Sequence, residues 1–386
     1  MAEVPTSSTH PPLPPTTEDD RLSWLRLLRS RRVGISTFWR LLAEHGTAQA
    51  ALVALPEVAR ASGMTDYQTC PEGVVIAEFK AGKAAGARLI GRGEPAYPQA
   101  LAEIADAPPL IWARGDMALL ARPMVALVGA RNASSLGTRM AKRLAEDLAE
   151  AGYVVVSGLA RGVDAAAHLA ALNGGTVAVM AGGVDVIYPT ENTGLGGDIA
   201  RRGLLVSEQP MGLQPQARHF PARNRIISGL ARVVVVVEAA AKSGSLITAR
   251  TALDQGREVL AVPGHPFDAR AAGCNMLIRD GAILVRSSTD VIEVLGQEAE
   301  PAQARLRLVP DVTPMPQPAA APLRSLRETA ALHGLILARL GPSPMAEDQL
   351  IRDLDSSSQR ITPVLIDLEL EGKIARQAGG LLSRIV

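Results

Sequence analysis

The feature that most constrains the fold is the stretch from Pro123 to Arg286, in which short apolar runs alternate with helical segments. The runs consist mainly of Val, Leu and Ile without polar alternation, as expected for strands that helices cover on both faces. Short glycine-containing turns separate them, so we predict a parallel, doubly wound α/β sheet. Ligands of such sheets bind beyond the carboxyl ends of the strands, where the strand order switches. The predicted strands are Val125–Val128, Tyr153–Ser157, Thr176–Met180, Gly203–Ser207, Val233–Glu238, Glu258–Ala261 and Ala282–Val285, and the predicted helices lie near 138–151, 163–173, 194–202, 222–231 and 245–255.

Shifts in composition divide the rest of the chain around this domain. We predict a disordered tail, a small helical domain of the helix-hairpin-helix type, an extended Rossmann-type domain, a linker rich in Pro and Ala, and a winged-helix domain of three helices and a hairpin. Two short strands, Arg88–Ile90 and Leu110–Trp112, are expected at the edge of the central domain. In chain order, the predicted bounds of the five segments are 1–18, 19–80, 85–296, 297–323 and 324–386.

The two terminal domains carry weaker signals. A glycine turn at Gly34 lies between two leucine-containing helical segments, and Ser36 or Thr37 is expected to cap the second helix. Hairpins of this kind can bind a DNA phosphate through backbone amides, but they also serve as packing or interaction units. Winged helices likewise bind duplex DNA in many proteins and contact other proteins elsewhere. The sequence leaves both alternatives open for both domains.

Charge and cysteine content exclude several functional classes. The formal net charge is only +1, so we exclude a histone-like coating of nucleic acid and expect any nucleic-acid site to be local. Cys70 and Cys274 are the only cysteines, too few for a disulfide framework or a thiolate metal site. No H-x-x-x-H pattern or carboxylate cluster is visible, so we predict no metal and no other cofactor. Without a secretory leader or an apolar run of about 18 residues, the chain is expected to be cytoplasmic, with no membrane partner.

A local basic stretch follows the fourth predicted strand of the α/β domain. Between Met211 and Val237 there is no carboxylate, whereas four arginines and Phe220 fall there. Arginine pairs with phosphate oxygens, and an aromatic ring stacks on a base. We expect Phe220–Gly229 to be a loop-like entry to an apolar helix. It either binds phosphate and base or simply begins a helix with solvated arginines.

The turn after the first predicted strand also favours an anion. It reads Gly129-Ala130-Arg131, and Arg131 stands where a dinucleotide site would have its second glycine. The second strand ends in Ser157-Gly158, without the acidic residue that would bind a ribose. We therefore reject a dinucleotide site. A phosphate held by Arg131 over the helix N-terminus is the functional interpretation, and a simple structural turn is the alternative.

Two further turns could carry chemistry. Asp164 and His168 lie four residues apart on one predicted helix. They could form an acid/base pair, but we favour a capping carboxylate and a buried, hydrogen-bonded histidine. Ser243 and Gly244 precede another helix, either as an anion-binding nest or as an ordinary N-cap. No set of nucleophile, base and orienting group is visible, so we predict no catalytic residue and no enzymatic activity.

Taken together, these motifs resemble the DNA-processing protein A family (DprA, also called Smf). The order and spacing of the motifs match over most of the α/β domain, and the two terminal domains are similar to accessory domains of the family. The resemblance rests on Val128–Arg131, Ser157–His168, Tyr188-Pro189-x-x-Asn192, Phe220–Gly229, Ser243–Arg250, and Val262-Pro263-Gly264 with Gly273-Cys274-Asn275.

The resemblance implies a domain that binds single-stranded DNA, forms a homodimer and hands the DNA to the RecA recombinase in natural transformation. Arg131 matches the arginine of the family's first turn, where Ala130 replaces a frequent serine. Arg218 lies close to the position of a lysine that the family often carries before Phe220. Phe220 and the three residues Arg223, Asn224 and Arg225 match the DNA-facing loop. The residues expected at the DNA are Gly129, Ala130, Arg131, Ser157, Gly158, Arg218, Phe220, Arg223, Asn224, Arg225, Ser243 and Gly244.

Two other functions compete with this hypothesis. Phosphoribohydrolases with a related Rossmann-type fold cleave nucleotides, but they carry P-G-G-x-G-T and a downstream catalytic Glu. Here the turn reads Ser243-Gly244-Ser245-Leu246-Ile247-Thr248, and the residues that follow contain Asp254 but no Glu. A transcription regulator acting through the winged helix is disfavoured, because its presumed recognition helix offers only Arg360 as a cation among three carboxylates.

Overall fold

The computed structural model describes residues 14–298, 326–341 and, with short gaps, 345–384. The chain divides into two compact units, each described here by itself. The first unit takes Arg29–Pro71 and the described residues from 326 onward, and the second takes residues 14–28 and 72–298. The predicted tail, 1–18, lies outside the described residues up to residue 13, and so does nearly all of the predicted linker, 297–323.

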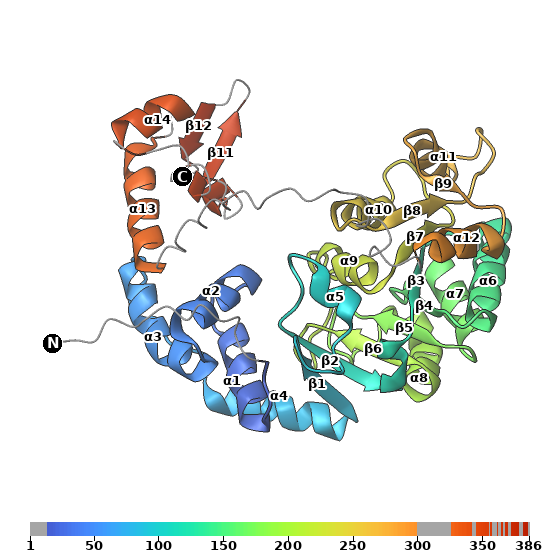
Figure 1. Ribbon diagram of the computed structural model, residues 1–386, viewed down its shortest axis with the longest axis horizontal. Helices are drawn as coiled ribbons and strands as arrows, with labels where there is room; N and C mark the ends of the chain where they lie inside the picture. Colours follow the sequence, from blue (N-terminus) through green and yellow to red (C-terminus); the bar gives the residue numbers. More distant parts are fainter. Residues whose placement is uncertain are drawn as a thin grey trace, which may run out of the picture. The chain divides into compact units, whose positions relative to one another are not determined.

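The second unit is built on one nine-stranded sheet, with the order β1-β2-β6-β5-β4-β3-β7-β8-β9 (Figure 1). Strands β3 to β9 are parallel, and β2 pairs antiparallel with both β1 and β6. The order switches between β3 and β7, whose register joins Val125 to Val233 and Val128 to Val236. The strands are β1 (Ala87–Gly91), β2 (Leu110–Gly115), β3 (Met124–Val128), β4 (Val154–Ser157), β5 (Thr176–Val179), β6 (Leu204–Ser207), β7 (Val233–Val236), β8 (Glu258–Ala261) and β9 (Ile283–Leu284).

Helices cover both faces of this sheet, which explains why the strands lack polar alternation. Along β3, Val125 and Leu127 belong to the core on one face, while Ala126 and Val128 belong to the core on the other. The first face is covered by α6 (Ser135–Glu150), α7 (Val163–Ala171) and α12 (Ser288–Glu298), and the second by α5 (Gln99–Glu103), α9 (His219–Leu230), α10 (Gly244–Asp254) and α11 (Ala272–Arg279) (Figure 1). The unit also contains α1 (Glu18–Arg29), α4 (Glu72–Ala84) and α8 (Thr193–Arg202).

The predicted fold class is confirmed, and the two strands expected at the edge of the sheet are present, with an antiparallel pairing that the structure adds. One local prediction is wrong: Phe220 does not lie in a loop-like entry, because α9 already begins at His219. Two backbone bonds start this helix early, from His219 N to Gln216 O at 2.9 Å and from Phe220 N to Ala217 O at 3.4 Å. Phe220 and Arg223 are three residues apart and therefore lie on one face of the helix, whereas Arg225 lies on another.

The first unit contains α2 (Ile35–His45), α3 (Ala48–Ala61) and the elements of the winged helix. The N-cap of α2 is Gly34, with no side-chain cap bond, so the expected capping by Ser36 or Thr37 is wrong. In the winged helix, a three-stranded sheet has the order β10-β12-β11. Most of the third predicted helix, 358–371, lies outside the described residues. The described elements are α13 (Leu326–Arg339), β10 (Met345–Ala346), α14 (Glu347–Asp353), β11 (Ile374–Gln377) and β12 (Leu381–Arg384).

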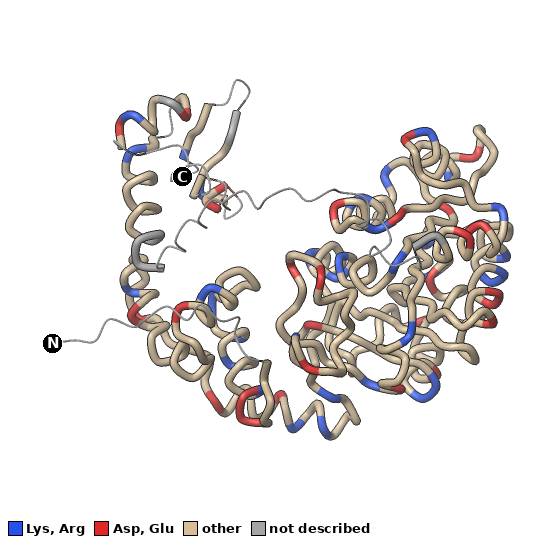
Figure 2. Tube along the Cα trace, viewed as in Figure 1, with Lys and Arg blue, Asp and Glu red and all other residues tan. Residues whose placement is uncertain are grey.

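Two searches concern the whole described chain. Among the residues that the structure describes, no helix has both the length and the apolar character needed to cross a membrane. Nor do the described His, Cys, Asp and Glu side chains gather in groups of three or more that could hold a metal ion. Figure 2 shows Lys and Arg positions interspersed with Asp and Glu positions along the second unit. A basic site on this unit must therefore be local.

Candidate nucleic-acid interface

A cavity of about 770 Å³ lies at the carboxyl ends of β3 and β7, where the strand order switches. The turn after β3, the first turns of α9, and the turn between β7 and α10 contribute its walls. This is the location that the topology predicts for a ligand of such a sheet. Of the residues expected at DNA, the cavity is lined by Gly129, Ala130, Arg131, Phe220, Arg223, Asn224, Ser243 and Gly244.

A cation and two aromatic rings lie next to one another at the edge of this cavity. Arg131 is exposed, and its guanidinium carbon lies 5.2 Å from the ring centroid of Phe220. The ring of Tyr188, which is 47% exposed, lies 5.7 Å from that of Phe220 at an angle of 52°. A second cavity of about 280 Å³ is lined by Arg131, Gly158, Tyr188 and Phe220, so Arg131 and Phe220 line both cavities. Arginine beside aromatic rings suits a phosphate with an adjacent base.

Arg223 occupies the floor of the cavity and not its rim. Arg223 is only 6% exposed, and its Nη1 donates to the carbonyl oxygens of Gly158 (2.7 Å) and Val179. A Cβ at Gly158 would lie 2.3 Å from Nη1 of Arg223, so a side chain there would displace the guanidinium from this position. Burial lowers the pKa of Arg223 to about 10, against the opposing effect of Asp164, so it stays charged at neutral pH. In this structure the charge is directed at the protein's own backbone.

Asp164 is the carboxylate of the same floor, and it binds the turn before α7. Its Oδ2 accepts from the amides of Gly158 (3.1 Å) and Ala160 (3.3 Å). Burial raises the pKa of Asp164, while Arg223 and the two amides act in the opposite direction. The turn closes at Gly162, whose φ of +75° and position against the Ala130 carbonyl exclude a side chain. The predicted capping role of Asp164 is wrong, because the N-cap of α7 is Gly162 without a side-chain cap bond and Asp164 instead binds the amides of the preceding turn.

His168 is fully buried and has a hydrogen-bond partner at each ring nitrogen. Nε2 accepts from the amide of Leu159 at 3.3 Å, and Nδ1 lies 2.7 Å from Thr176 Oγ1. Because Thr176 Oγ1 donates its own proton to Val155 O, Nδ1 must be the donor and the ring is neutral. Burial lowers the pKa of His168 to about 3. The prediction of a buried, satisfied histidine is confirmed, and its bonds to the protein occupy the atoms that an acid/base pair would use.

Three of the expected residues line neither cavity, whereas Gly158 lines the smaller one. The hydroxyl of Ser157 is buried and donates to Leu127 O at 2.6 Å. Arg225 forms ion pairs with Glu208 and with Asp106, the latter at 3.4 Å from Nε. Arg218 is exposed, and its Nε donates to Nε2 of His219 at 3.3 Å. Their contacts with DNA remain predictions, and of the three only Arg218 presents an exposed guanidinium.

The N-terminus of α6, where a phosphate was expected, holds the chain's own carboxylate. Glu238 Oε2 accepts from the amide of Ser134 at 2.8 Å, and Ser134 Oγ accepts from the amide of Gly137 at 2.9 Å. Oε2 of Glu238 would lie 2.6 Å from a Cβ at Gly137, so the carboxylate fits closely against the first turn. A phosphate bound by Arg131 would therefore lie beside the cavity and not on the α6 dipole. At α10, Ser243 is an ordinary N-cap that accepts from Ser245 N.

The structure adds residues to the site that the sequence reasoning missed. Tyr188 contributes a second ring, and Lys242 and Arg270 line the larger cavity. A tyrosine before the proline in Tyr188-Pro189 was a visible signal, since exposed aromatics are rare in a chain that is 3% aromatic. Arg270 could not be found in this way, because only the fold brings the loop after β8 next to the turn after β7.

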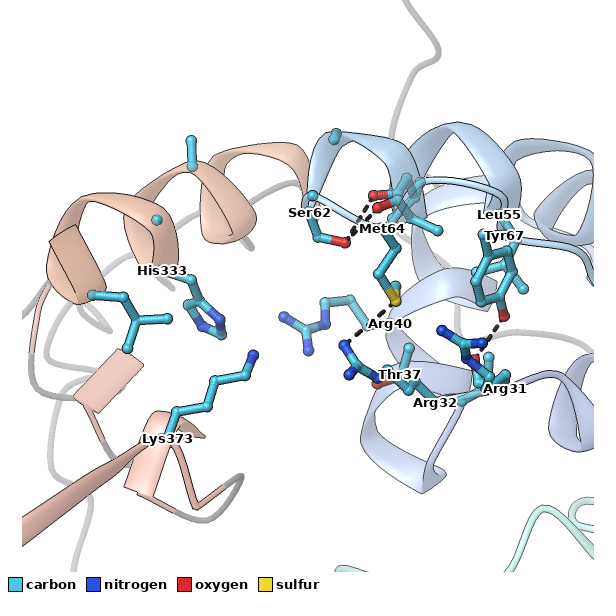
Figure 3. A pocket seen from close by; sticks show the side chains of 18 residues that line it. Arg31, Arg32, Thr37, Arg40, Leu55, Ser62, Met64, Tyr67, His333 and Lys373 are labelled. Atoms are coloured by element: carbon cyan, nitrogen blue, oxygen red, sulfur yellow. Dashed lines mark hydrogen bonds between the residues drawn. The ribbon is translucent and has the colours of Figure 1, made fainter. Parts of the chain in front are cut away.

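A separate basic cluster lies in the first unit, around the turn before α2 (Figure 3). Arg31, Arg32 and Arg40 surround this turn, with the side chain of Arg32 bonded to Met64 Sδ at 3.4 Å. Tyr67 Oη donates to the carbonyl of Arg31 at 2.7 Å, which holds the turn against the following segment. The predicted hairpin therefore carries guanidinium groups in addition to backbone amides. Both alternatives for it, DNA contact and protein contact, remain open.

Comparison with known proteins gives three family matches along the chain. Residues 88–296 match the family described as DNA recombination-mediator protein A, residues 18–81 match the DprA-like N-terminal HHH domain, and residues 316–380 match the DprA winged helix domain. The DNA processing protein DprA of Streptococcus pneumoniae is 49% identical over 198 residues, which cover 51% of this chain and 70% of the relative. Protein Smf of Escherichia coli is 38% identical over 301 residues, 76% of each chain.

Two solved structures share the fold. DNA processing protein A of Streptococcus pneumoniae has a TM-score of 0.54 at 42% identity, covering 58% of this chain and 77% of that one. DNA processing protein A of Helicobacter pylori, whose structure is described as giving insight into its single-stranded DNA binding mode, has a TM-score of 0.51 at 31% identity, covering 55% and 96%. The family match over residues 88–296, which contain the whole cavity, and the relatives at up to 49% identity lead to one conclusion. This chain belongs to the DNA recombination-mediator protein A (DprA/Smf) family.

Proposed function

We propose that the α/β domain binds single-stranded DNA in the cavity between the turn after β3 and the start of α9. The observation that carries the proposal is the exposed guanidinium of Arg131 lying over the ring of Phe220, with the ring of Tyr188 beside it. Arg131 would bind a phosphate, and the two rings would stack bases. Support also comes from the Helicobacter pylori relative, whose structure is described by its single-stranded DNA binding mode.

Stacking on a ring requires an unpaired base with a free face. The site should therefore prefer single-stranded to duplex DNA and show little sequence preference. The test is a titration of labelled single-stranded and duplex oligonucleotides of equal length over a salt series. We expect tighter binding of the single strand at every salt concentration, with affinity falling as salt rises. Equal affinity for the two forms would contradict the proposal.

The bound strand would then pass to the RecA recombinase, which is the role that the family resemblance implies. In this role the chain protects incoming DNA during natural transformation in the cytoplasm and loads RecA on it. A measurable consequence is faster RecA filament formation on DNA already covered by a single-strand-binding protein. A Phe220→Ala variant, which should bind the strand about 5- to 150-fold more weakly, should show weaker stimulation, because a mediator that releases the strand easily delivers less of it. Undiminished stimulation by that variant would separate RecA loading from this cavity.

We propose that this role requires no catalysis by the chain. The two groups near the cavity with acid/base chemistry are already bonded, Asp164 to two backbone amides and His168 to Leu159 and Thr176. Nucleotide cleavage of the phosphoribohydrolase type is thus expected to be absent. Incubation with nucleoside monophosphates should release no free base above a control without protein.

The same domain is proposed to form a homodimer through its own surface. Strand β9 is the outer strand of the sheet, and its two residues, Ile283 and Leu284, are 40% and 41% exposed. These two exposed apolar side chains are the surface that we propose the second chain covers. Leu284→Lys should convert the dimer to a monomer in sedimentation, whereas Leu169→Lys on α7, where Leu169 is 55% exposed, should not. A parent protein that sediments as a monomer at all concentrations would refute the homodimer.

A further inference from the structure

The loop between β8 and α11 exposes an aromatic ring to solvent. Phe267 is 95% exposed, whereas Phe38 is fully buried and Phe79 and Phe220 are partly buried. The ring of His265 lies 5.5 Å from that of Phe267 at an angle of 38°. Solvating a whole phenyl ring forgoes the burial free energy that a core position would provide. Because the chain has only four phenylalanines, a fully solvated one indicates that this position binds a ligand.

Hydrogen bonds hold this loop in place at both ends. Asn275 donates to Gly264 O at 2.9 Å and accepts from Gly264 N at 3.1 Å, which fixes the first residue. Two successive turns follow, from Asp268 N to His265 O and from Ala271 N to Asp268 O, each 2.9 Å long. Asp268 also accepts from Arg270 N at 3.0 Å. The ring of Phe267 is therefore presented by an ordered loop, which lowers the entropic cost of binding a ligand.

The loop also adjoins the candidate DNA site. Arg270 lines the same cavity as Arg131 and Phe220, together with Lys242. The preceding residues His265 and Asp268 line another cavity, of about 590 Å³, with Arg139 of α6. The loop thus lies between a cavity assigned to DNA and a second cavity at the same edge of the sheet. Phe267 precedes Arg270 by three residues on this loop, so their Cα atoms lie at most about 11 Å apart.

We infer that the loop 264–271 extends the single-strand path, with Phe267 as a second stacking platform for an unpaired base and His265 behind its ring. The inference rests on the proposed function of the Arg131–Phe220 cavity. An oligonucleotide is the occupant that fits, because the loop adjoins a phosphate-and-base site whose cavity is also lined by the exposed Lys242. The loop contact would therefore depend on the length of the strand.

Charge on the loop predicts how this contact responds to salt. The Arg270 guanidinium is paired with Asp268, with Nε 3.2 Å from Oδ1, so the loop itself adds no net charge. The gain would come from stacking, which releases no counterions. Removing the ring should therefore weaken binding without changing the slope of log K against log salt.

The experiment measures binding of thymidine oligonucleotides over a length series from about 4 to about 16 nucleotides. The variants are Phe267→Ala and Phe267→Trp, with Leu253→Ala as the control, since Leu253 is 56% exposed at the far end of α10. We expect Phe267→Ala to bind the shortest strands like the parent and to bind the longest about 5- to 150-fold more weakly. Phe267→Trp should retain the affinity, and the control should match the parent at every length.

Two results would overturn the inference. One is a Phe267→Ala protein that binds every length like the parent while Phe220→Ala binds weakly, which would leave the proposed function intact. The other is a parallel loss of affinity and self-association, since that would assign Phe267 to contact between two copies of the chain. Failure of the proposed function is distinguishable, because the parent would then show no preference for single-stranded DNA at any length.

Discussion

The rim and the floor of the main cavity use the same residue type in opposite ways. The rim consists of Arg131, Phe220 and Tyr188, and the floor consists of Gly158, Asp164, His168 and Arg223. At the rim, the guanidinium of Arg131 is exposed above a ring. At the floor, the guanidinium of Arg223 donates to two backbone carbonyls and lies near a buried carboxylate. The guanidinium of Arg131 is open to a ligand, whereas that of Arg223 is hydrogen-bonded to the protein itself. We therefore assign ligand binding to the rim and structural support of the site to the floor.

The comparison shows why a count of arginines does not define a binding surface. Of the four arginines between Met211 and Val237, Arg223 donates to backbone carbonyl oxygens and Arg225 is paired with two carboxylates. Asp106 and Glu208 both lie outside the stretch from Met211 to Val237. The sequence of the stretch therefore overstates the positive charge that remains unpaired in the folded protein. The floor still serves the site, because Arg223 connects the turn after β4 to the carboxyl end of β5 directly beneath the rim.

The largest effect is expected from a change in the floor. Arg223→Met removes the charge that faces Asp164 and leaves the carbonyls of Gly158 and Val179 without this donor. Breaking a buried pair by removing one partner costs about 3–5 kcal/mol. We therefore expect a loss of this size in the free energy of unfolding, measured by urea denaturation. Arg131→Met is the matched control and should change that free energy by less than about 0.5 kcal/mol.

This comparison of the two arginines would fail if Arg223→Met kept the parent's stability and lost its affinity for single-stranded DNA. Arg223 would then be a direct phosphate contact, as the family resemblance implies for this position.

The next effect tests whether the rim binds bases. Phe220→Ala removes the ring that lies under Arg131 and beside Tyr188. One stacked base is worth about 1–3 kcal/mol, so affinity for single-stranded DNA should fall about 5- to 150-fold. The salt slope should not change, because no charge is lost. Fluorescence anisotropy with Phe220→Trp as a control measures this, and a folded Phe220→Ala protein with the parent's affinity would remove Phe220 from the interface.

A third effect uses pH to test the floor. The pKa of His168 is about 3 in the folded protein and near 6.5 when unfolded, so between these values only the unfolded chain binds the proton. The contribution of the neutral ring is complete above pH 6.5 and is lost as pH falls toward 3, by about 1.4 kcal/mol per pH unit. Asp164, with its raised pKa, acts with the opposite sign above its unfolded value of 3.8.

The contribution of His168 is isolated by comparison with His168→Gln, which retains an acceptor for Leu159 and a donor for Thr176. The difference between the two unfolding free energies should shrink as pH falls from 6.5. Parallel curves for parent and variant would show that His168 titrates normally.

The sequence predicted the layers of the molecule better than the details of its site. Uninterrupted Val and Leu runs require cover on both faces, so the parallel sheet followed from local pattern alone. The roles of Arg223 and Arg225 did not, because their partners Gly158, Val179, Glu208 and Asp106 come from other elements. Glu238 at the start of α6 is another long-range contact, across 104 positions. Spacing along the chain can identify a candidate side chain, but it cannot show which groups that side chain contacts in the folded protein.

The smallest expected effect concerns the charge at the rim. Arg131 is exposed, so a phosphate bound to it would release about one counterion, and Arg131→Ala should flatten the slope of log K against log salt by about 0.7 for a single strand. Over a fourfold rise in salt, the ratio of parent to variant affinity should therefore shrink about 2.6-fold. Arg201→Ala is a suitable control, because its guanidinium pairs with Asp198 on α8, lines neither cavity and should leave the slope nearly unchanged. If Arg131→Ala weakens binding with the parent's slope, Arg131 acts by positioning the ring of Phe220 and not by holding a phosphate. The rim would then bind bases alone, and the phosphates would have to meet Lys242 or Arg218 instead.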